Sequence, residues 1–488
     1  MSPMLANANP SALSGPPHAF LAVALLVMFI SGCAVGPNYQ QPTTPQASTF
    51  KEAGDWVVAA PADTLERGPW WQLFGDPVLD QLESRVEVSN QNVAVAVGAY
   101  AQARALVRGQ SAALFPAVNL NGGVTRSRSS GNLTTGLPGR TGTNYQASLG
   151  GTWEPDVWGR LGRAVDGASA GARASAADLA SAKLSAQGEL AVNYFSLRQT
   201  DAQMTLLDNT VAGYVRALEI TQNRYDAGIA ARTDLLQAQT QLASGKADRA
   251  GLERTRAQFE HAIAVLVGDV PANFILVPVA NWAPVVPQVP LGVPSTLLQR
   301  RPDIAAAERR VAASNEQIGI AKSAYYPNIS LNASAGSGAS KVADLFKAAS
   351  SVWSLGLSAA QLVFDAGATT ARVEGAEASN AQAVARYRQT VLMAFQEVED
   401  QLVATRVLQT QQALRREASE AADLVEQQVI NRYKSGQVGY TDVISAQATA
   451  QNARRTLVQV MADRQTTAVA LIRALGGGWQ AGAINAEP

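Results

Sequence analysis

The chain has 488 residues, and its 39 Lys and Arg are balanced by 39 Asp and Glu. This balance gives no basic field for nucleic acid and no acidic field for a cationic partner. With only two histidines and one cysteine, the chain cannot build a His/Cys zinc cluster or an internal disulfide.

Residues 1–32 are predicted to be a signal peptide. Ala19 to Ile30 is an unbroken run of twelve apolar residues, shorter than the roughly 20 that a membrane-spanning helix needs. A run of this length before small residues is typical of a secretory signal. The following "ISGC" resembles a bacterial lipobox, which implies that Cys33 is acylated and becomes the mature N-terminus; the alternative is a free buried thiol. Ala34, rather than Asp, follows the cysteine, which favours sorting to the outer membrane.

The next segment is expected to be an extended arm that leads into a helix. Residues 34–69 are rich in Pro, Gln, Thr and Ala and have no core of their own. Asp76 is a candidate helix cap, with Pro77 at the first helical position. The helix is expected to run to about Leu114, because Pro116 stops it.

Two pairs of strands are predicted, at 117–129 with 144–155 and at 327–339 with 351–362. From Trp353 to Ala360, apolar residues alternate with Ser, Gly and Ala. Alternation with a period of two over about ten residues is typical of a membrane β-barrel strand. An ordinary surface hairpin over a core is the alternative.

Four strands are too few to close a barrel, for which about eight is the minimum. An open sheet edge is not tolerated in lipid, because its backbone groups have no water to bind. The chain is therefore expected to associate. Two copies would supply about eight strands and a filled interior, whereas three would supply about twelve and begin to leave a channel, which favours a trimer if the function is transport.

Proline placement predicts two very long helices. The chain has 22 prolines, yet none lies between Pro155 and Pro271, or between Pro327 and Pro488. These gaps are filled with Ala, Gln, Leu, Arg and Glu, which are good helix formers. We expect helices over about 159–226 and 366–434, each on the order of 100 Å long at 1.5 Å per residue.

A doubled phrase marks the end of each long helix. "NRYDAGIAARTDLLQAQ" (223–239) and "NRYKSGQVGYTDVISAQ" (431–447) lie 208 positions apart and share 8 of 17 residues. Gly228 and Gly436 are expected to supply left-handed helix caps in tight turns. Returning helices should begin at Thr233-Asp234 and Thr441-Asp442, with Thr or Asp as the cap.

The repeated phrase therefore indicates a tandem duplication. The predicted division of the chain is a signal peptide (1–32), an acylated arm (33–76), a first repeat (77–270), a linker (271–294), a second repeat (295–478) and a C-terminal tail (479–488).

The chain resembles the outer membrane efflux proteins of Gram-negative bacteria, which are TolC-like outer membrane factors. The resemblance is closest to their lipoprotein branch (OprM- and NodT-like). It rests on "GCAVGPNYQQP", "WWQLFGDPVLDQL", the segment that begins "RRPDI" at Arg300, and the doubled phrase. The resemblance implies an α+β membrane protein: a trimeric 12-stranded outer-membrane β-barrel continued by a periplasmic α-helical coiled-coil tunnel. It also implies the exit duct of a tripartite pump, joined to a periplasmic adaptor and an inner-membrane transporter, commonly of the resistance-nodulation-division class.

The resemblance further implies a gate at the helix tips. Asp442 matches a carboxylate that lines the closed constriction. Ser445 occupies a position that is Asp in the family, so this ring is expected to be less acidic. Asp234, with Thr233, corresponds to the partner of Tyr433 in an inter-helix latch; the alternative is that Asp234 and Asp442 only cap helices.

Competing functions have weaker support. Glu154 and Asp156 in "WEPD" have the residue types of a glycosidase pair, but Asp156 is more simply a helix cap, so we expect no enzyme, cofactor or metal. A lipid-anchored periplasmic coiled-coil adaptor is the alternative function, against which the four strands argue. An inner-membrane carrier lacks any apolar run of about 18 residues. The cargo, whether drugs, solvents, metal ions or siderophores, is not visible in the sequence.

Overall fold

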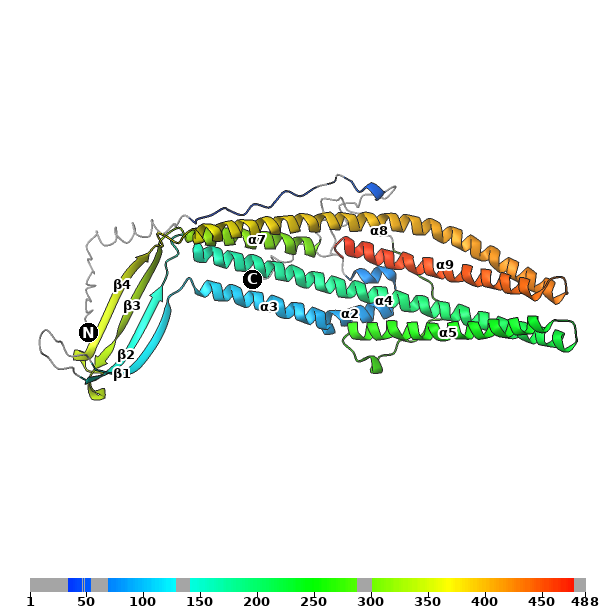
Figure 1. Ribbon diagram of the computed structural model, residues 1–488, viewed down its shortest axis with the longest axis horizontal. Helices are drawn as coiled ribbons and strands as arrows, with labels where there is room; N and C mark the ends of the chain where they lie inside the picture. Colours follow the sequence, from blue (N-terminus) through cyan, green and yellow to red (C-terminus); the bar gives the residue numbers. More distant parts are fainter. Residues whose placement is uncertain are drawn as a thin grey trace, which may run out of the picture. The chain divides into compact units, whose positions relative to one another are not determined.

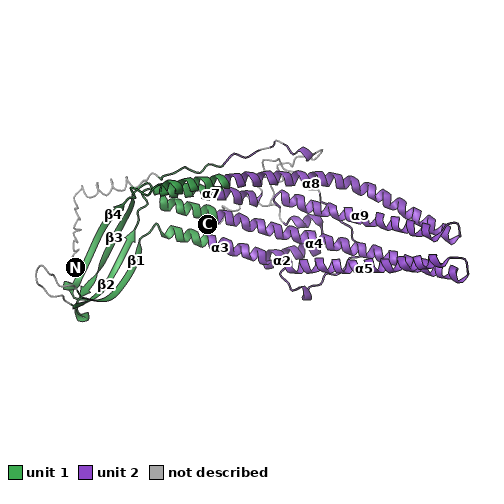
Figure 2. Cartoon of the chain, viewed as in Figure 1, with its two compact units in different colours: residues 1–41, 104–171, 311–382 green, residues 42–103, 172–310, 383–488 purple. Residues whose placement is uncertain are grey.

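The computed structural model describes residues 34–45, 47, 49–53, 69–128, 141–287 and 301–477. The chain divides into two compact units (Figure 2). One contains the described residues of 1–41, 104–171 and 311–382, and the other those of 42–103, 172–310 and 383–488. Each unit draws on both copies of the predicted repeat, so the spatial division does not follow the division of the sequence.

The first unit holds a four-stranded antiparallel sheet in the order β1-β2-β3-β4 (Figure 1). The strand bounds are β1 Ala117–Arg128, β2 Thr141–Trp153, β3 Asn328–Ala339 and β4 Ser351–Ala360. The predicted strands are confirmed. Pairing of β2 with β3 joins the two copies of the repeat, with Leu149 opposite Ala335.

The sheet has one hydroxyl-rich face and one apolar face between β3 and β4. Ser330 and Ser358 bind across the strands at 2.7 Å, and Ser334 and Ser354 bind at 2.8 Å. Because side chains alternate along a strand, Trp353, Leu355 and Leu357 lie on the opposite face. Within the single chain, 80%, 68% and 73% of their surfaces are exposed. This exposure is expected for strands whose apolar face contacts lipid.

The expected helix over 77–114 is two helices, α2 Pro77–Ser89 and α3 Gln91–Ala112, so the prediction of one continuous helix was wrong. Asn90 has an extended backbone, with φ −68° and ψ 125°. Its Oδ1 accepts from the backbone N–H groups of Asn92 and Val93, which starts α3. Its Nδ2 donates to the carbonyl of Leu266 at 2.8 Å. The distant contact adds to the local cap, and Asn90, a preferred N-cap residue, was the local signal that the prediction did not use.

Asp76 caps α2 as predicted. Its Oδ1 accepts from the backbone N–H groups of Val78 and Leu79. Its Oδ2 accepts from the Tyr194 hydroxyl at 2.6 Å. Burial raises the pKa of Tyr194, and the bond to Asp76 adds to the rise, so the phenol stays neutral. The cap therefore also ties α2 to the long helix that carries Tyr194.

Both long helices are confirmed, as α4 Arg160–Asp226 and α8 Ala368–Lys434. Each has 67 residues, about 100 Å at 1.5 Å per residue. Asp156 accepts from the N–H groups of Leu161 at 2.9 Å and Gly162 at 2.6 Å. It therefore caps α4, as expected.

The returning helices are α5 Arg232–Leu266 and α9 Tyr440–Ala474. The remaining helix of the part that the structure describes is α7 Pro302–Ser323. Short 3₁₀ turns are η1 Lys51–Ala53, η3 Trp70–Phe74, η4 Pro271–Asn273, η5 Val342–Asp344 and η6 Ala348–Ser350. No helix of the described residues carries an apolar stretch of the length and hydropathy that a bilayer crossing requires.

The predicted Thr or Asp caps of the returning helices were wrong. Ala231 and Gly439 occupy the N-cap positions, and neither offers a side-chain acceptor. Thr233-Asp234 and Thr441-Asp442 lie inside the first turn. The Asp442 carboxylate instead reaches back and accepts from the Gly439 N–H at 3.2 Å. Negative charge in a first helical turn is favourable because it opposes the positive end of the helix dipole.

Candidate channel gate

Two tight turns connect the long helices to the returning helices (Figure 1). Gly228 has φ +71° and Gly436 has φ +74°, which is the left-handed conformation. Directly after Gly228 in the chain, the N–H of Ile229 donates to the carbonyl of Arg224 at 2.8 Å. In the second turn, the N–H of Gln437 donates to the carbonyl of Arg432 at 2.9 Å. A Cβ added at either glycine would meet no atom within 4 Å. The glycines are therefore required by the backbone conformation and not by crowding.

Close to these turns, Tyr433 is buried, with 4% of its surface exposed. Its hydroxyl lies 3.1 Å from the Thr221 Oγ1. Arg224 donates to the Tyr433 backbone carbonyl at 2.8 Å, and its guanidinium carbon lies 4.8 Å from the centre of the Tyr433 ring. Tyr433 is on α8, whereas Thr221 and Arg224 are on α4. These contacts therefore join the two helical hairpins, and we call these three residues the tip cluster.

Apolar side chains surround the tip cluster. Tyr433, Tyr440, Ala238 and Val443 form one buried hydrophobic group, and the two tyrosine rings are 5.6 Å apart. Burial raises the pKa of Tyr440 to about 12. Its hydroxyl finds no hydrogen-bond partner among the described residues. The phenol therefore remains neutral at physiological pH and contributes through packing.

The structure does not bring Asp234 to Tyr433 within the single chain. Asp234 is half-buried and Thr233 exposed in the first turn of α5. The Tyr433 hydroxyl is instead directed to Thr221. The Asp234 carboxylate makes no hydrogen bond to any of the described residues. Any bond that Asp234 makes at the tip therefore requires a rearrangement or another copy of the chain.

Asp442 and Ser445 lie together on one exposed side of α9. Both line an open groove between α8 and α9, whose other wall includes Val429 and Arg432. They are three positions apart and therefore neighbours on the helix surface. The Asp442 carboxylate and the Ser445 hydroxyl therefore face the same groove, which Arg432 also lines.

The sequence interpretation missed Thr221 and Arg224. Arg224 is part of the doubled "NRY", which was the available signal, but the two copies are used differently. Tyr433 is 4% exposed, whereas its counterpart Tyr225 is 37% exposed. The arginine of the first copy therefore binds the tyrosine of the second, and the reverse pairing is not made.

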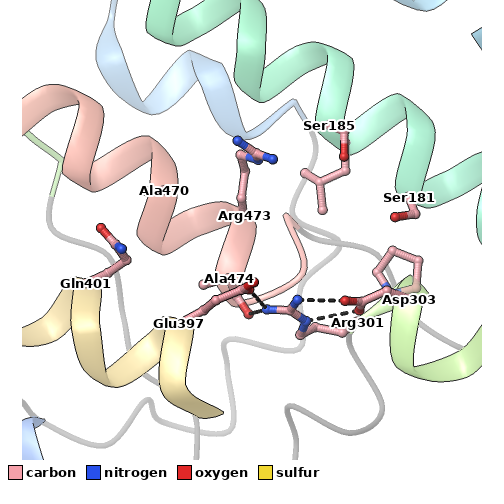
Figure 3. Close-up of a pocket in the computed structure, with 11 residues that line it drawn as sticks. Ser181, Ser185, Arg301, Asp303, Glu397, Gln401, Ala470, Arg473 and Ala474 are labelled. Atoms are coloured by element: carbon pink, nitrogen blue, oxygen red, sulfur yellow. Dashed lines mark hydrogen bonds and ion pairs between the residues drawn. The ribbon is translucent and has the colours of Figure 1, made fainter. Parts of the chain in front are cut away.

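A second polar cluster is centred on Arg301 of the "RRPDI" segment (Figure 3). Arg300 lies outside the described residues. Arg301 donates two hydrogen bonds to Asp303, one to Glu397 at 2.6 Å and one to the carbonyl of Ala474 at 3.0 Å. Burial lowers the pKa of Arg301, but the bonds to Asp303 and Glu397 more than offset this and raise the pKa. The cluster joins the start of α7 to α8 and to the end of α9. The cluster therefore acts as a structural junction between these three helices.

Cys33 lies outside the described residues. Among the residues that the structure describes, no group of three or more His, Cys, Asp or Glu side chains is arranged to hold a metal ion.

Comparisons with known proteins agree over nearly the whole chain. The family model described as outer membrane efflux protein matches residues 82–269 and 293–477. The probable efflux pump outer membrane protein TtgC of Pseudomonas putida is 31% identical over 96% of this chain and 97% of its own. The pyoverdine export outer membrane protein OpmQ of Pseudomonas putida is 31% identical over 90% and 94%. The solved structure of the outer-membrane channel OprN aligns with a TM-score of 0.86 at 29% identity, covering 92% of this chain and all of that one.

Proposed function

The chain belongs to the outer membrane efflux protein family and is an outer-membrane efflux channel; from this premise we propose that three copies share one pore that is gated at the helix tips. The channel is a passive exit duct and not an enzyme. The observation that carries the gate is the tip cluster, in which a buried tyrosine and an arginine join two hairpins by breakable polar contacts.

The trimer is supported by the edges of the sheet. In the order β1-β2-β3-β4, one side of β1 and one side of β4 lack a partner strand within the described chain. Unpaired backbone groups are not tolerated in lipid. Antiparallel pairing of β4 with β1 of the next copy satisfies both edges, and three copies close a barrel of about twelve strands.

Three-fold symmetry converts each side chain at the tip into a ring of three. Asp442 and Ser445 are proposed to line the resting constriction, because both face an open groove on the same side of α9. Tyr433 is proposed to hold the latch, with Thr233 and Asp234 contributing once neighbouring copies are in place. Gly228 and Gly436 form the turns at which the hairpins reverse.

The proposed partners are a periplasmic membrane-fusion adaptor and an inner-membrane transporter, of the resistance-nodulation-division type. Cys33 is proposed to carry the lipid that anchors the mature chain, after removal of residues 1–32. The arm (33–76), the two repeats (77–270 and 295–478) and the linker (271–294) are the proposed divisions of the mature protein. Organic solvents and pyoverdine, named for relatives, are candidate cargo classes, with the choice made by the transporter.

Single-channel recording in planar bilayers tests the gate. In the combined variant Tyr433→Phe and Asp234→Ala, we expect higher conductance or more frequent opening than in the unmodified trimer. Tyr225→Phe is the matched control, because Tyr225 has the same place in the other copy of the phrase but is exposed. If the combined variant and the control conduct alike, the latch proposal fails.

A further inference from the structure

Two arginines follow the apolar band on one face of β1. Leu120 and Val124 belong to this band and are 81% and 64% exposed. Because side chains alternate between the two faces of a strand, Arg126 and Arg128 lie on the same face as these residues. In an outer-membrane channel, the apolar face of each strand contacts lipid and the polar face lines the lumen. The two arginines are therefore on the lipid side of the sheet.

The neighbouring strand shows the depth at which these arginines lie. Tyr145 of β2 is opposite Val124 and therefore shares its face. Trp153 is on this face eight residues further along β2, which is about 27 Å along the strand, or about 20 Å along the membrane normal at a tilt of about 40°. An apolar band with an aromatic residue at each end is typical of a membrane barrel. Tyr145 and Trp153 therefore mark the two surfaces of the membrane.

Tyr145 marks the surface that is remote from the helices. The Trp153 Nε1 donates to the carbonyl of Leu114 at 2.9 Å, so Trp153 is at the end of the sheet that joins the helices. The last residues of β1 and the first residues of β2 form the opposite end (Figure 1). The helical tunnel of this family of outer-membrane channels is periplasmic. The Tyr145 end of the sheet therefore lies at the outer leaflet.

The arginines lie just beyond Tyr145, where lipid headgroups begin. Arg126 is opposite Thr143, and Arg128 is opposite Thr141. Two guanidinium groups and two hydroxyl groups therefore share one face, and we call these four residues the rim site. Thr143 is two residues beyond Tyr145, about 7 Å along the strand or about 5 Å along the normal, within a headgroup layer about 5–7 Å thick.

The positive charge of the rim site is not neutralised by the described chain. Both arginines are exposed, and neither forms a hydrogen bond or an ion pair with a described residue. The four strands contain no Asp or Glu. Asp344, in the connection between β3 and β4, is paired with Lys347 at 2.6 Å. The lipid side of the sheet therefore ends in unpaired cations at headgroup depth.

We propose that the rim site binds the phosphate groups of a lipid in the outer leaflet. A guanidinium group donates two parallel hydrogen bonds to one phosphate, which makes arginine well suited to this ligand. The Cα atoms of Arg126 and Arg128 are about 7 Å apart along the strand, so the two side chains bind one phosphate together or the two phosphates of a diphosphorylated headgroup. The hydroxyls of Thr141 and Thr143 are further donors. The acyl chains of the same lipid pack on the apolar band below.

Binding of fluorescent lipid A to the full-length protein in detergent tests this assignment. Lipid A with two phosphates should bind at least about tenfold more tightly than dephosphorylated lipid A, because each charged hydrogen bond contributes roughly this factor. Arg126→Gln combined with Arg128→Gln should lose the preference. Inorganic phosphate at the same concentration should not displace the labelled lipid. Displacement would show that the site takes free anions, and the lipid assignment would be wrong.

Two matched variants separate the rim site from charge in general. Arg372→Gln removes an exposed arginine of α8 in the same unit and should keep the preference for phosphorylated lipid. Arg126→Ser combined with Ser127→Arg keeps the charge of β1 but moves it to the lumen face, because neighbouring residues point to opposite faces. The preference should then fall toward that of the double glutamine variant. An unchanged preference in either rim variant would overturn the assignment.

Each copy of the chain contains a whole rim site, so the result does not depend on the proposed trimer or gate. Heat-modifiable migration checks the assembly of every variant. If a variant does not assemble, the two lipids compared on the unmodified protein remain decisive, because equal affinities would overturn the assignment. An unmodified protein that stayed monomeric would contradict the proposed trimer, whereas the lipid comparison would still decide the rim site.

Discussion

Replacing Arg224 by Gln should favour the open channel, because it removes two of the contacts by which α4 holds Tyr433 and leaves the bond to Thr221. The lost contacts are a charged hydrogen bond to the Tyr433 carbonyl at 2.8 Å and a cation–π contact at 4.8 Å. A charged hydrogen bond contributes about 1.5–3 kcal/mol, and a cation–π contact about 0.5–1 kcal/mol. Arg224 is only half-buried, so we take the lower end, about 2 kcal/mol per protomer.

The predicted size of the effect depends on how the three tips move. If each tip opens independently, about 2 kcal/mol favours its open state by about 30-fold. If all three open together, the sum of about 6 kcal/mol corresponds to a shift of about 3 × 10⁴-fold. The size of the increase in open probability in the variant therefore also shows whether the three tips open independently or together.

Single-channel recording in planar bilayers measures this directly, with Arg216→Gln as the control. Arg216 is exposed on the same helix, so its replacement removes the same charge without touching the Tyr433 carbonyl. Helical content from circular dichroism should be unchanged in both variants. Equal open probabilities for Arg224→Gln and Arg216→Gln would show that the tip cluster does not hold the gate shut.

Two other predictions concern single charges. Glu83 is fully buried, neither of its carboxylate oxygens has a partner among the described residues, and burial, with a contribution from Asp80, raises its pKa to about 9. The folded chain therefore keeps a proton that the unfolded chain loses above about pH 4.5, so the free energy of unfolding falls as pH rises from about 4.5 to about 9. At pH 8, the Glu83→Gln variant should be more stable than the unmodified protein by a few kcal/mol. Denaturant unfolding of the two proteins at pH 5 and pH 8 checks this, and a pH-independent difference in stability would contradict it. Ser445→Asp adds a carboxylate one turn from Asp442 in each copy. A nearby charge in water contributes about 1 kcal/mol, so the cation-over-anion permeability ratio, measured as a reversal potential in a salt gradient, should rise about fivefold. An unchanged ratio would place residue 445 away from the constriction.

Much of the fold follows from local patterns in the sequence. Proline-free stretches predicted α4 and α8, alternation with a period of two indicated β4 among the four predicted strands, and the doubled glycines marked the turns. These features depend on the conformational preferences of neighbouring residues, so the sequence contains the necessary information. The break at Asn90 belongs to this class only in part, because its Oδ1 caps α3 locally, whereas its Nδ2 donates to the carbonyl of Leu266, 176 positions away.

The sequence by itself determined the two long helices, the strands, the turns and the resemblance to a channel family. Only the tertiary structure decided which copy of the "NRY" phrase builds the tip cluster. The physical reason is that burial depends on which elements become neighbours. Thr221 and Tyr433 are 212 positions apart. Tyr225 and Tyr433 both stand in an Asn-Arg-Tyr triplet of phrases that share 8 of 17 residues, yet only Tyr433 is enclosed. Equal local sequence therefore predicts equal local structure, while the contacts that give each residue its role are set by the packing of the whole chain.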